Sequence, residues 1–375
     1  MRIGIDGIPL ATPKSGIGHY TYELARSIAA LLPSDRLELV APVPIDLPAN
    51  HLETELPTNL SAVHAPLNPL RRRWWTLGLP LYARLNRLAL FHGTNYNVPL
   101  WNPCPTVVTI HDLSLLLYPD THQEHLVARA RERLPVMTRL ATRIVTDSET
   151  VKREICEHLS VSPEKITSVA LAPRQVFRPM SVADAHEVRQ RFRLPEEFIL
   201  FVGTVEPRKN LLTLVRAFEE LLCTTDLKPQ LVIAGQRGWM NDELFALIEQ
   251  GSLHDHVLFL GYVTDEDLRA LYSCCRVAVY PSIYEGFGLP PLEAMACGAP
   301  VITSRIPVIM ETSANAARLV NPTDSRELTA ALVELLSDAD ARTQLGRAGL
   351  ARAAEYTWER TAKQTLAVYE EALLA

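Results

Sequence analysis

Short apolar runs alternate with amphipathic stretches along almost the whole chain. In the first half, short apolar runs bounded by polar or turn residues predict buried strands at Arg2–Ile5, Leu37–Ala41, Leu88–Phe91, Val107–Ile110 and Ile144–Thr146. Apolar residues at helical spacing predict helices at Tyr20–Leu32, Trp74–Asn86 and Glu124–Ala141. Pro135 lies inside the last of these helices and predicts a kink or break there.

A second series of the same kind begins after residue 195. Its predicted strands are Phe198–Val202, Leu231–Ala234, Val257–Leu260, Val277–Tyr280 and Val301–Thr303, and its predicted helices are Leu211–Leu222, Asp242–Ile248, Asp265–Ser273 and Pro291–Cys297. From Ser325 onward the pattern is entirely helical, and the last helix, Trp358–Leu374, could pack on either half. Strand–helix alternation predicts parallel sheets covered on both faces.

The two series predict an α/β protein with two doubly wound, Rossmann-like domains. Between them runs the non-periodic stretch LAPRQVFRPM, which contains Pro173 and Pro179 and is typical of a linker. Doubly wound sheets bind ligands beyond the carboxyl ends of their strands. We therefore expect two domains that face each other across a cleft, with the chemistry of the protein at those strand ends.

Composition narrows the class of protein. The chain has 375 residues, 47% of them hydrophobic and 21% charged, which is typical of a globular protein and excludes a disordered or fibrous one. A formal net charge of −6 argues against a dedicated nucleic-acid binder. The six cysteines show no metal-ligand or C-x-x-C spacing, and we expect them to be buried and reduced. The opening MRIGIDGIPLATP has no apolar signal segment and no run is long enough to span a bilayer, so the expected location is the cytoplasm.

Two motifs in the first half admit both a functional and a structural interpretation. Gly16 and Gly18 lie in SGIGHY at the start of a predicted helix, where backbone N–H groups could approach a phosphate or sugar; a tight turn is the alternative. His111 and Asp112 end a predicted strand, where a histidine could bond a sugar or donate a proton. The alternative is a capping aspartate beside a structural histidine. Ser148, in TDSE, is predicted to cap a helix.

A cationic loop follows the first strand of the second half. The segment GTVEPRKNL places Arg208 and Lys209 together between a strand end and a helix start. Two adjacent cations in that position are typical of an anion site and can neutralise a departing diphosphate. The alternative is a solvated pair of charges in a loop.

A second loop with chemical character follows the strand Val277–Tyr280. It reads YEGFGLPPLEAMACGAPVI, with Glu285 expected in the loop and Glu293 in the first turn of the helix. Gly298 is predicted to end that helix. The glycines leave backbone N–H groups open to a ligand, and the carboxylates can accept hydrogen bonds from hydroxyl groups. Acidic residues also favour helix N-termini, which offers a structural reason for Glu293 alone.

With these motifs in place, the sequence resembles the retaining glycosyltransferases of family 4, which have the GT-B fold. The resemblance rests on SGIGHY, the His-Asp pair, TDSE, EPRKNL, the two glutamates with seven residues between them, and TWERTA near the C-terminus, and so spans nearly the whole chain. Within the family, the likeness is greatest to bacterial mannosyltransferases that build O-antigen and related surface polysaccharides.

The resemblance implies a role for each matching residue. Arg208 and Lys209 would bind the nucleotide diphosphate, Glu293 the ribose hydroxyls, and Glu285 the hydroxyls of the donor sugar. Gly16 and Gly18 would face the phosphates and acceptor, and His111 would contact the sugar near the reacting centre. Backbone N–H groups from a further run would assist Glu285: Gly286, Phe287, Gly288 and Leu289.

The resemblance also implies the domain plan and the reaction. The last helix, 358–375, would join residues 1–175 as the acceptor-side domain, and residues 176–357 would bind the nucleotide sugar. The expected reaction transfers mannose from GDP-mannose, with retention, to a hydroxyl of a glycan or lipid-linked oligosaccharide. No metal or other cofactor is expected, because the sequence offers no D-x-D carboxylate pair at a suitable strand end.

Other functions remain open at this point. The donor could instead be a UDP- or dTDP-sugar, or the chain could be a catalytically silent sugar-nucleotide sensor or scaffold. The chain is short for a phosphorylase of similar fold, and a periplasmic binding protein should carry a signal peptide. The residues Arg71–Trp75 also have two interpretations: peripheral contact with the inner membrane face near a lipid-linked acceptor, or a helix that packs its tryptophans into the core.

Overall fold

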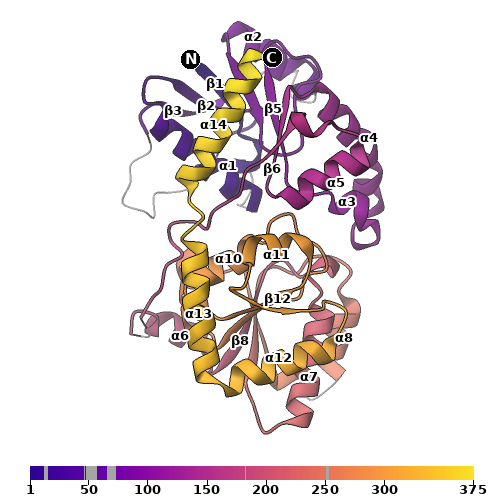
Figure 1. Cartoon of the computed structure of the whole chain (residues 1–375), viewed down its shortest axis with the longest axis vertical. Helices are drawn as coiled ribbons and strands as arrows, with labels where there is room; N and C mark the ends of the chain where they lie inside the picture. The colour runs from indigo at the N-terminus through magenta and orange to yellow at the C-terminus, as the bar shows by residue number, and fades with distance from the viewer. Residues whose placement is uncertain (12–15, 46, 48–56, 66–72, 182, 251–252) are drawn as a thin grey trace. The chain divides into compact units, whose positions relative to one another are not determined.

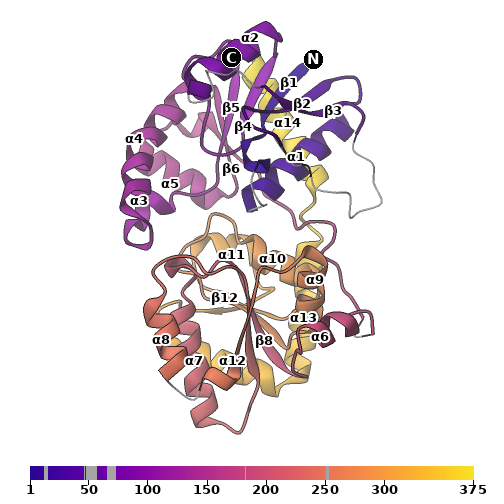
Figure 2. The same ribbon diagram turned by 180° about the vertical axis from the view of Figure 1, so that it is seen from behind.

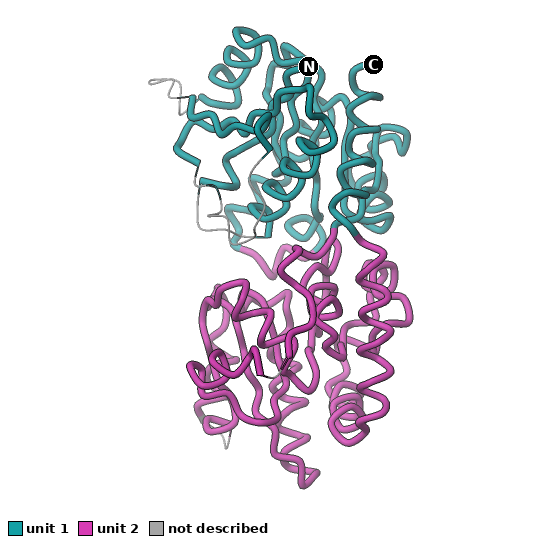
Figure 3. The backbone as a smooth tube through the Cα atoms, turned by 90° about the vertical axis from the view of Figure 1, so that its left-hand side faces the viewer, with its two compact units in different colours: residues 1–117, 123–171, 357–375 teal, residues 118–122, 172–356 magenta. Residues whose placement is uncertain are grey.

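The computed structural model describes residues 1–11, 16–45, 47, 57–65, 73–181, 183–250 and 253–375. The chain forms two compact units (Figure 3). Unit 1 comprises Met1–Leu117, Gln123–Leu171 and Thr357–Ala375, and unit 2 comprises Tyr118–His122 and Ala172–Tyr356.

Unit 1 is built on a seven-stranded parallel sheet with the order β3-β2-β1-β4-β5-β6-β7 (Figure 1). The strands are β1 Arg2–Asp6, β2 Arg36–Ala41, β3 Leu60–His64, β4 Leu90–Gly93, β5 Thr106–Ile110, β6 Arg143–Thr146 and β7 Ile166–Ser168. Its helices are α1 Gly16–Leu31, α2 Leu79–Leu85, α3 Ser114–Leu117, α4 Glu124–Leu140, α5 Glu149–Leu159 and α14 Trp358–Leu374. Shorter turns are η1 Ile8–Leu10, the π-helix η3 Trp74–Gly78, and η5 Pro163–Lys165.

Unit 2 is built on a six-stranded parallel sheet with the order β10-β9-β8-β11-β12-β13. Its strands are β8 Phe198–Val202, β9 Gln230–Ala234, β10 Val257–Gly261, β11 Val277–Tyr280, β12 Val301–Ser304 and β13 Arg318–Val320. Its helices are α6 His186–Arg191, α7 Leu211–Thr224, α8 Asp242–Gln250, α9 Asp265–Cys274, α10 Leu289–Ala296, α11 Pro307–Ser313, α12 Ser325–Ser337 and α13 Ala339–Ala353. The short turns are η4 Pro119–Thr121, η6 Pro207–Lys209 and η7 His254–His256.

Both sheets have helices on both faces, which explains their apolar sequences. In β8, Phe198, Ile199, Leu200 and Phe201 have no exposed surface. Successive strand residues point to opposite faces, so such a run is stable only between two layers of helices. Figure 2 shows α9, α10 and α13 on one side of the unit 2 sheet and α7, α8 and α12 on the other.

In each sheet the order in which successive strands are added reverses at one point. Doubly wound sheets bind their ligands at that point. In both units the strand order is that of the doubly wound Rossmann sheet, with the switch between β1 and β4 in unit 1 and between β8 and β11 in unit 2. The predicted α/β architecture with two Rossmann-like domains is confirmed.

The structure departs from the predicted elements in a few places. Three strands were not predicted: β3, β7 and β13, each of which is short and lies at or beside a sheet edge. The helix α4 is not broken at Pro135. A proline leaves the carbonyl four residues earlier, that of Arg131, without its helical partner, and Arg131 is exposed, so water can serve that group. The six cysteines are free, but only Cys275 and Cys297 are buried, and Cys223 is exposed.

The unit boundaries lie close to the expected domain boundaries but are not identical to them. The first unit ends at Leu171 rather than 175, and Thr357 belongs with the last helix. Residues Tyr118–His122 belong to unit 2 although both neighbouring segments belong to unit 1. The reason is local: the Tyr118 ring lies 5.0 Å from that of Tyr284, and the Trp239 indole N–H donates to the Thr121 carbonyl at 2.8 Å.

Candidate functional site

The cationic loop of unit 2 begins where β8 ends, at the switch point of the sheet. Pro207–Lys209 form the turn η6, and Asn210 follows in the left-handed conformation with φ of 58°. The Asn210 amide donates to the carbonyls of Pro281 and Pro322 at 2.9 and 2.7 Å. The Ile283 N–H also donates to the Arg208 carbonyl at 3.0 Å. These bonds fix the loop after β8 against the loop after β11.

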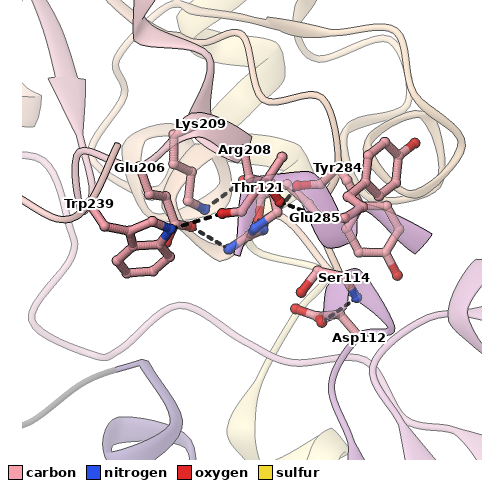
Figure 4. Close-up of polar contacts among 10 residues, drawn as sticks. Asp112, Ser114, Thr121, Glu206, Arg208, Lys209, Trp239, Tyr284 and Glu285 are labelled. Atoms are coloured by element: carbon pink, nitrogen blue, oxygen red, sulfur yellow. Dashed lines mark hydrogen bonds and ion pairs between the residues drawn. The ribbon is translucent and has the colours of Figure 1, made fainter. Parts of the chain in front are cut away.

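Four charged side chains meet between these two loops (Figure 4). The Arg208 guanidinium contacts Glu206 Oε1 at 2.7 Å and Glu285 Oε2 at 3.2 Å, and it donates to the Tyr284 carbonyl at 3.0 Å. The Lys209 ammonium donates to Glu285 Oε1 at 2.7 Å. The side chains of Arg208, Lys209 and Glu285 are only 13%, 15% and 12% exposed. The alternative of a solvated charge pair is therefore wrong.

The charge state of Glu285 follows from this pairing. Burial alone would raise the pKa of its carboxyl group, but the charges of Lys209 and Arg208 lower that pKa to about 2. The side chain is thus a carboxylate at any physiological pH. It can accept hydrogen bonds from hydroxyl groups, and it holds two cations in place while doing so.

The glycine-rich segment after Glu285 leads into α10. Gly288 precedes the first helical residue with φ of 93°, and a Cβ atom there would lie 2.5 Å from Ile309 Cδ1. Only glycine fits this position without strain. Phe287 is buried and stacks edge-on against Tyr356, with ring centroids 5.8 Å apart. The N-terminus of α10 is therefore held rigidly beside the charged cluster, and Gly298 ends the helix with φ of 81°, as predicted.

Glu293 does not lie where the sequence predicted. It is the fifth residue of α10, beyond the first turn, so a helix-terminus charge effect does not explain it. Its carboxylate Oε1 accepts from Arg174 Nε at 3.1 Å, and Arg174 also contacts Asp265 Oδ2 at 2.6 Å. Burial raises the pKa of Glu293, and Arg174 opposes that effect. Arg174 was not predicted, because it lies in the non-periodic stretch after β7 and nothing in the sequence there indicates its partners.

In unit 1, His111 follows β5 and is 9% exposed. Its Nε2 lies 2.9 Å from the Thr94 carbonyl and its Nδ1 lies 2.8 Å from Asp147 Oδ2. A carbonyl only accepts, so Nε2 carries a proton, and the carboxylate favours a second proton on Nδ1. Burial would lower the pKa of His111, but Asp147 and the Thr94 carbonyl raise it above its ordinary value. Both ring nitrogens are thus engaged, and the surroundings favour the protonated ring.

The aromatic surroundings of His111 connect it to the C-terminal helix. The Tyr20 ring meets the His111 ring edge-on at 4.8 Å, and the Tyr20 hydroxyl bonds Thr109 Oγ1 at 2.9 Å. Thr109 Oγ1 in turn bonds His92 Nε2 at 2.8 Å, and His92 Nδ1 bonds the hydroxyl of Tyr369, on α14, at 2.7 Å. A continuous chain of buried side chains therefore runs from the candidate histidine to the last helix of the protein.

The smaller motifs of unit 1 have clear local roles. Gly16 and Gly18 lie in the first turn of α1 and neither has positive φ, so they form a helix N-terminus rather than a glycine-dependent turn. Asp112 Oδ1 accepts from the Ser114 N–H at 2.9 Å and so caps α3 (Figure 4). Ser148 caps α5 by accepting from the Val151 N–H at 3.2 Å, as predicted.

The tryptophan pair follows the core-packing interpretation in part. Trp74 is 4% exposed and packs with Tyr82 and Phe91, whereas Trp75 is only partly buried. Arg71 and Arg72 lie outside the described residues. Within the described ranges, no helix is long and apolar enough to cross a membrane, and no group of three or more His, Cys, Asp and Glu side chains is arranged to hold a metal ion.

Comparison with known proteins places the chain in a family. Residues 14–170 match the family described as Glycosyltransferase Family 4, and residues 183–352 match Glycosyl transferases group 1. The chain is 32% identical to the O-antigen chain mannosyltransferase B of Escherichia coli, covering 99% of this chain and 100% of that protein.

Solved structures show the same fold. Sucrose-phosphate synthase from Thermosynechococcus elongatus superposes with a TM-score of 0.78 at 23% identity, covering 99% of this chain and 98% of that one. Anabaena Alr3699/HepE, solved with UDP-glucose, superposes with a TM-score of 0.76 at 18% identity over 99% of each chain. The chain therefore belongs to the family 4 glycosyltransferases and has their GT-B fold.

Proposed function

We propose that this glycosyltransferase moves mannose from GDP-mannose, with retention of the anomeric configuration, to a hydroxyl group of a surface glycan or lipid-linked oligosaccharide of the O-antigen type. The observation that carries the proposal is the buried cluster of Arg208, Lys209 and Glu285 at the switch point of the unit 2 sheet. The full-length similarity to a mannosyltransferase of O-antigen supports the choice of sugar and product class.

The cluster suits a leaving nucleoside diphosphate. Negative charge develops on the diphosphate as the bond to the sugar breaks, and fixed cations in a largely buried site stabilise that charge. An ammonium group has three N–H donors, and Glu285 takes one of those of Lys209. The other N–H groups of Lys209 can bind phosphate oxygens. Two cations of this kind would supply the charge that a metal ion supplies in other transferases, so the proposed reaction runs without metal.

The carboxylates and glycines take the remaining parts of the donor. Glu285 would accept hydrogen bonds from the sugar hydroxyls, assisted by the backbone N–H groups of residues 286–289. Glu293, oriented by Arg174, would accept from the ribose hydroxyls. In unit 1, Gly16 and Gly18 would present N–H groups of the α1 N-terminus to phosphate or acceptor, and His111 would offer its positive charge near the reacting centre.

Retention without a protein nucleophile requires that both bonds change on one face of the sugar. In the proposed step the C1–O bond to the diphosphate breaks and its electron pair stays on the diphosphate. The acceptor oxygen forms the new bond to C1 from the same face, and its proton passes to a diphosphate oxygen. No group of the protein needs to form a covalent intermediate.

A thermal unfolding panel in the presence of EDTA tests the donor. A ligand that binds only the folded protein raises the midpoint, by about 2.7 kcal/mol of stabilisation at a hundred times its Kd. We expect GDP and GDP-mannose to raise it, and UDP, ADP and dTDP compounds not to. A shift with UDP- or dTDP-sugars alone would refute the mannose donor and leave a glycosyltransferase of other specificity. No shift with any nucleotide would favour a catalytically silent scaffold instead.

A further inference from the structure

A cavity of about 560 Å³ in unit 1 belongs to none of the sites described above. It lies between the π-helix η3 and the helix α4, a volume within the range of about 300–1,000 Å³ that is usual for ligand pockets. Its walls are mostly apolar. They are formed by Ile8, Pro42, Trp74, Trp75, Thr76, Leu100, Val136 and Met137, with Arg73, Glu132 and Arg133 as the charged residues.

The walls are fixed by the fold. The Leu100 N–H donates to the Trp75 carbonyl at 2.9 Å, and the Trp75 ring meets Phe91 of β4 edge-on at 6.5 Å. Met137 is buried in the core below. The π-helix is itself a rare element, and such elements are frequent at functional sites. The cavity is therefore a feature of a well-packed region.

Two residues that line this cavity have donor groups without partners in the described part of the chain. Arg133 is half-buried, and no carboxylate of the described residues pairs with it. Burial, together with the nearby charge of Arg129, lowers its pKa. The indole N–H of Trp74 is buried and has no hydrogen-bond acceptor in the described part of the chain. The Arg133 guanidinium is suited to an anionic ligand rich in acceptor oxygens.

The apolar rim of the cavity indicates a second property of the ligand, an apolar part in addition to the anionic group. Leu100 and Val136, which line the cavity, are 42% and 37% exposed, and Trp101 beside Leu100 is 50% exposed. A small inorganic anion would leave this apolar surface in water. An amphiphile with an anionic head would cover it and remove it from water, which is favourable. The carboxylate of Glu132 lies at the exposed rim, so the cavity carries two cations and one anion.

We propose that the cavity between η3 and α4 binds an amphiphilic phosphate ester, with the phosphate at Arg133 and Arg73 and the hydrocarbon chain along Trp75, Leu100 and Val136. The inference deepens the proposed function by assigning a place to the lipid phosphate of a lipid-linked acceptor, and for that role it rests on the proposed function. The binding of an amphiphilic phosphate ester to the cavity does not rest on the proposed function.

The test is a fluorescence titration of the full chain with dodecyl phosphate below its micelle concentration, without nucleotide. Trp74 and Trp75 are the reporters. We expect a saturable change with dodecyl phosphate, and a weaker one or none with inorganic phosphate or dodecyl maltoside. Arg133→Gln should raise the Kd about tenfold, because the amide cannot give the phosphate a hydrogen bond from a charged group. Arg131→Gln is the matched control, since Arg131 is exposed on the same helix and does not line the cavity.

Several outcomes would overturn the inference. Equal Kd values for Arg133→Gln and Arg131→Gln would do so, as would dodecyl maltoside binding as tightly as dodecyl phosphate. Inorganic phosphate binding as tightly as dodecyl phosphate would mean a site for the free anion. Binding to phosphatidylglycerol vesicles that both substitutions weaken equally, without saturable dodecyl phosphate binding, would mean a charged membrane-contact surface instead.

The experiments distinguish failure of the proposed function from failure of the proposed binding to the cavity. The titration contains no donor, so Arg133-dependent binding can be observed even if the chain transfers no sugar. Conversely, release of GDP from GDP-mannose with a soluble glycan acceptor would support the transfer reaction even if dodecyl phosphate does not bind. The thermal midpoint of Arg133→Gln, measured with GDP present, confirms that the variant is folded.

Discussion

At the scale of single residues, Lys209 has the most direct predicted effect on donor binding. Its ammonium is held beside the Arg208 guanidinium by Glu285, so Lys209→Met removes one of two adjacent cations. We expect the Kd for GDP to rise at least tenfold and the transfer rate to fall, since both depend on the diphosphate contact. Calorimetric titration with GDP measures the first effect. Lys363→Met, on the exposed face of α14, is the control; equal affinities in the two variants would refute the assignment.

Glu285→Gln should separate rate from affinity. The amide keeps the shape of the side chain but loses the negative charge that now pairs with Arg208 and Lys209. GDP should therefore bind as well as before or better, while the transfer rate falls at least tenfold, because the sugar loses an anionic hydrogen-bond acceptor. Steady-state rates beside GDP titrations would show the split. A parallel loss in both would reduce Glu285 to a nucleotide-binding residue.

The His111–Asp147 pair predicts a pH dependence of stability. The folded-state pKa of His111 is raised above its ordinary value, so the pair stabilises the fold fully below about pH 6.5 and loses this contribution as pH rises through the raised pKa. Asp147→Asn should lower the free energy of unfolding at pH 6 more than at pH 9. Urea unfolding at both pH values measures this. Glu157→Gln, an exposed carboxylate of α5, should show no such difference.

Residues of the site were predictable only where local sequence fixes their neighbours. Arg208, Lys209 and Glu285 could be placed together, because each follows a strand of a parallel sheet and the carboxyl ends of such strands share one edge. The same argument applies to His111 and Asp147, which directly follow the paired strands β5 and β6, although the sequence analysis did not pair them. Arg174 could not be paired with Glu293 in this way. Arg174 lies in a loop, 119 residues before Glu293, and no strand end places it beside its partner.

At the scale of elements, the entry into α10 offers a sharp test. Gly288 has positive φ and no room for a Cβ atom, so Gly288→Ala must either strain the backbone or displace Ile309. We expect a loss of about 1–3 kcal/mol in the free energy of unfolding. Gly16→Ala is the matched control, since Gly16 has ordinary φ and no described atom within 4 Å of its Cβ position. Chemical denaturation compares them; similar losses would contradict the argument.

Elements were predictable from sequence in proportion to their burial. The strands at the centre of each sheet, such as β8 and β11, are continuous apolar runs and were placed to the residue. The edge strand β3 has one buried residue, Leu60, and is otherwise partly or fully exposed, and β7 and β13 have only three residues each. The hydrophobic pattern of such short or half-exposed strands does not differ from that of loops. Their extended conformation is stabilised by pairing with the neighbouring strand rather than by their own sequence.

At the scale of the whole molecule, α14 completes unit 1 although it is the last element of the chain. Tyr369 is fully buried and bonds His92 in β4, and Trp358 packs toward Tyr20 in α1, with ring centroids 6.3 Å apart. Removing residues 357–375 should expose this face and unfold unit 1, whereas unit 2 keeps its core and its charged cluster. Proteolysis and GDP titration of the truncated chain measure the two effects. A truncated chain with unit 1 intact would contradict the role of α14.

The same feature sets the order in which the protein can be made. The strands β1 to β7 are synthesised first. Their packing is completed only by α14, which begins more than 180 residues after β7. Unit 2, apart from Tyr118–His122, is one uninterrupted stretch and is complete before α14 appears. The half that is translated second can thus reach its native state first, and the half translated first stays incompletely packed until α14 has been synthesised.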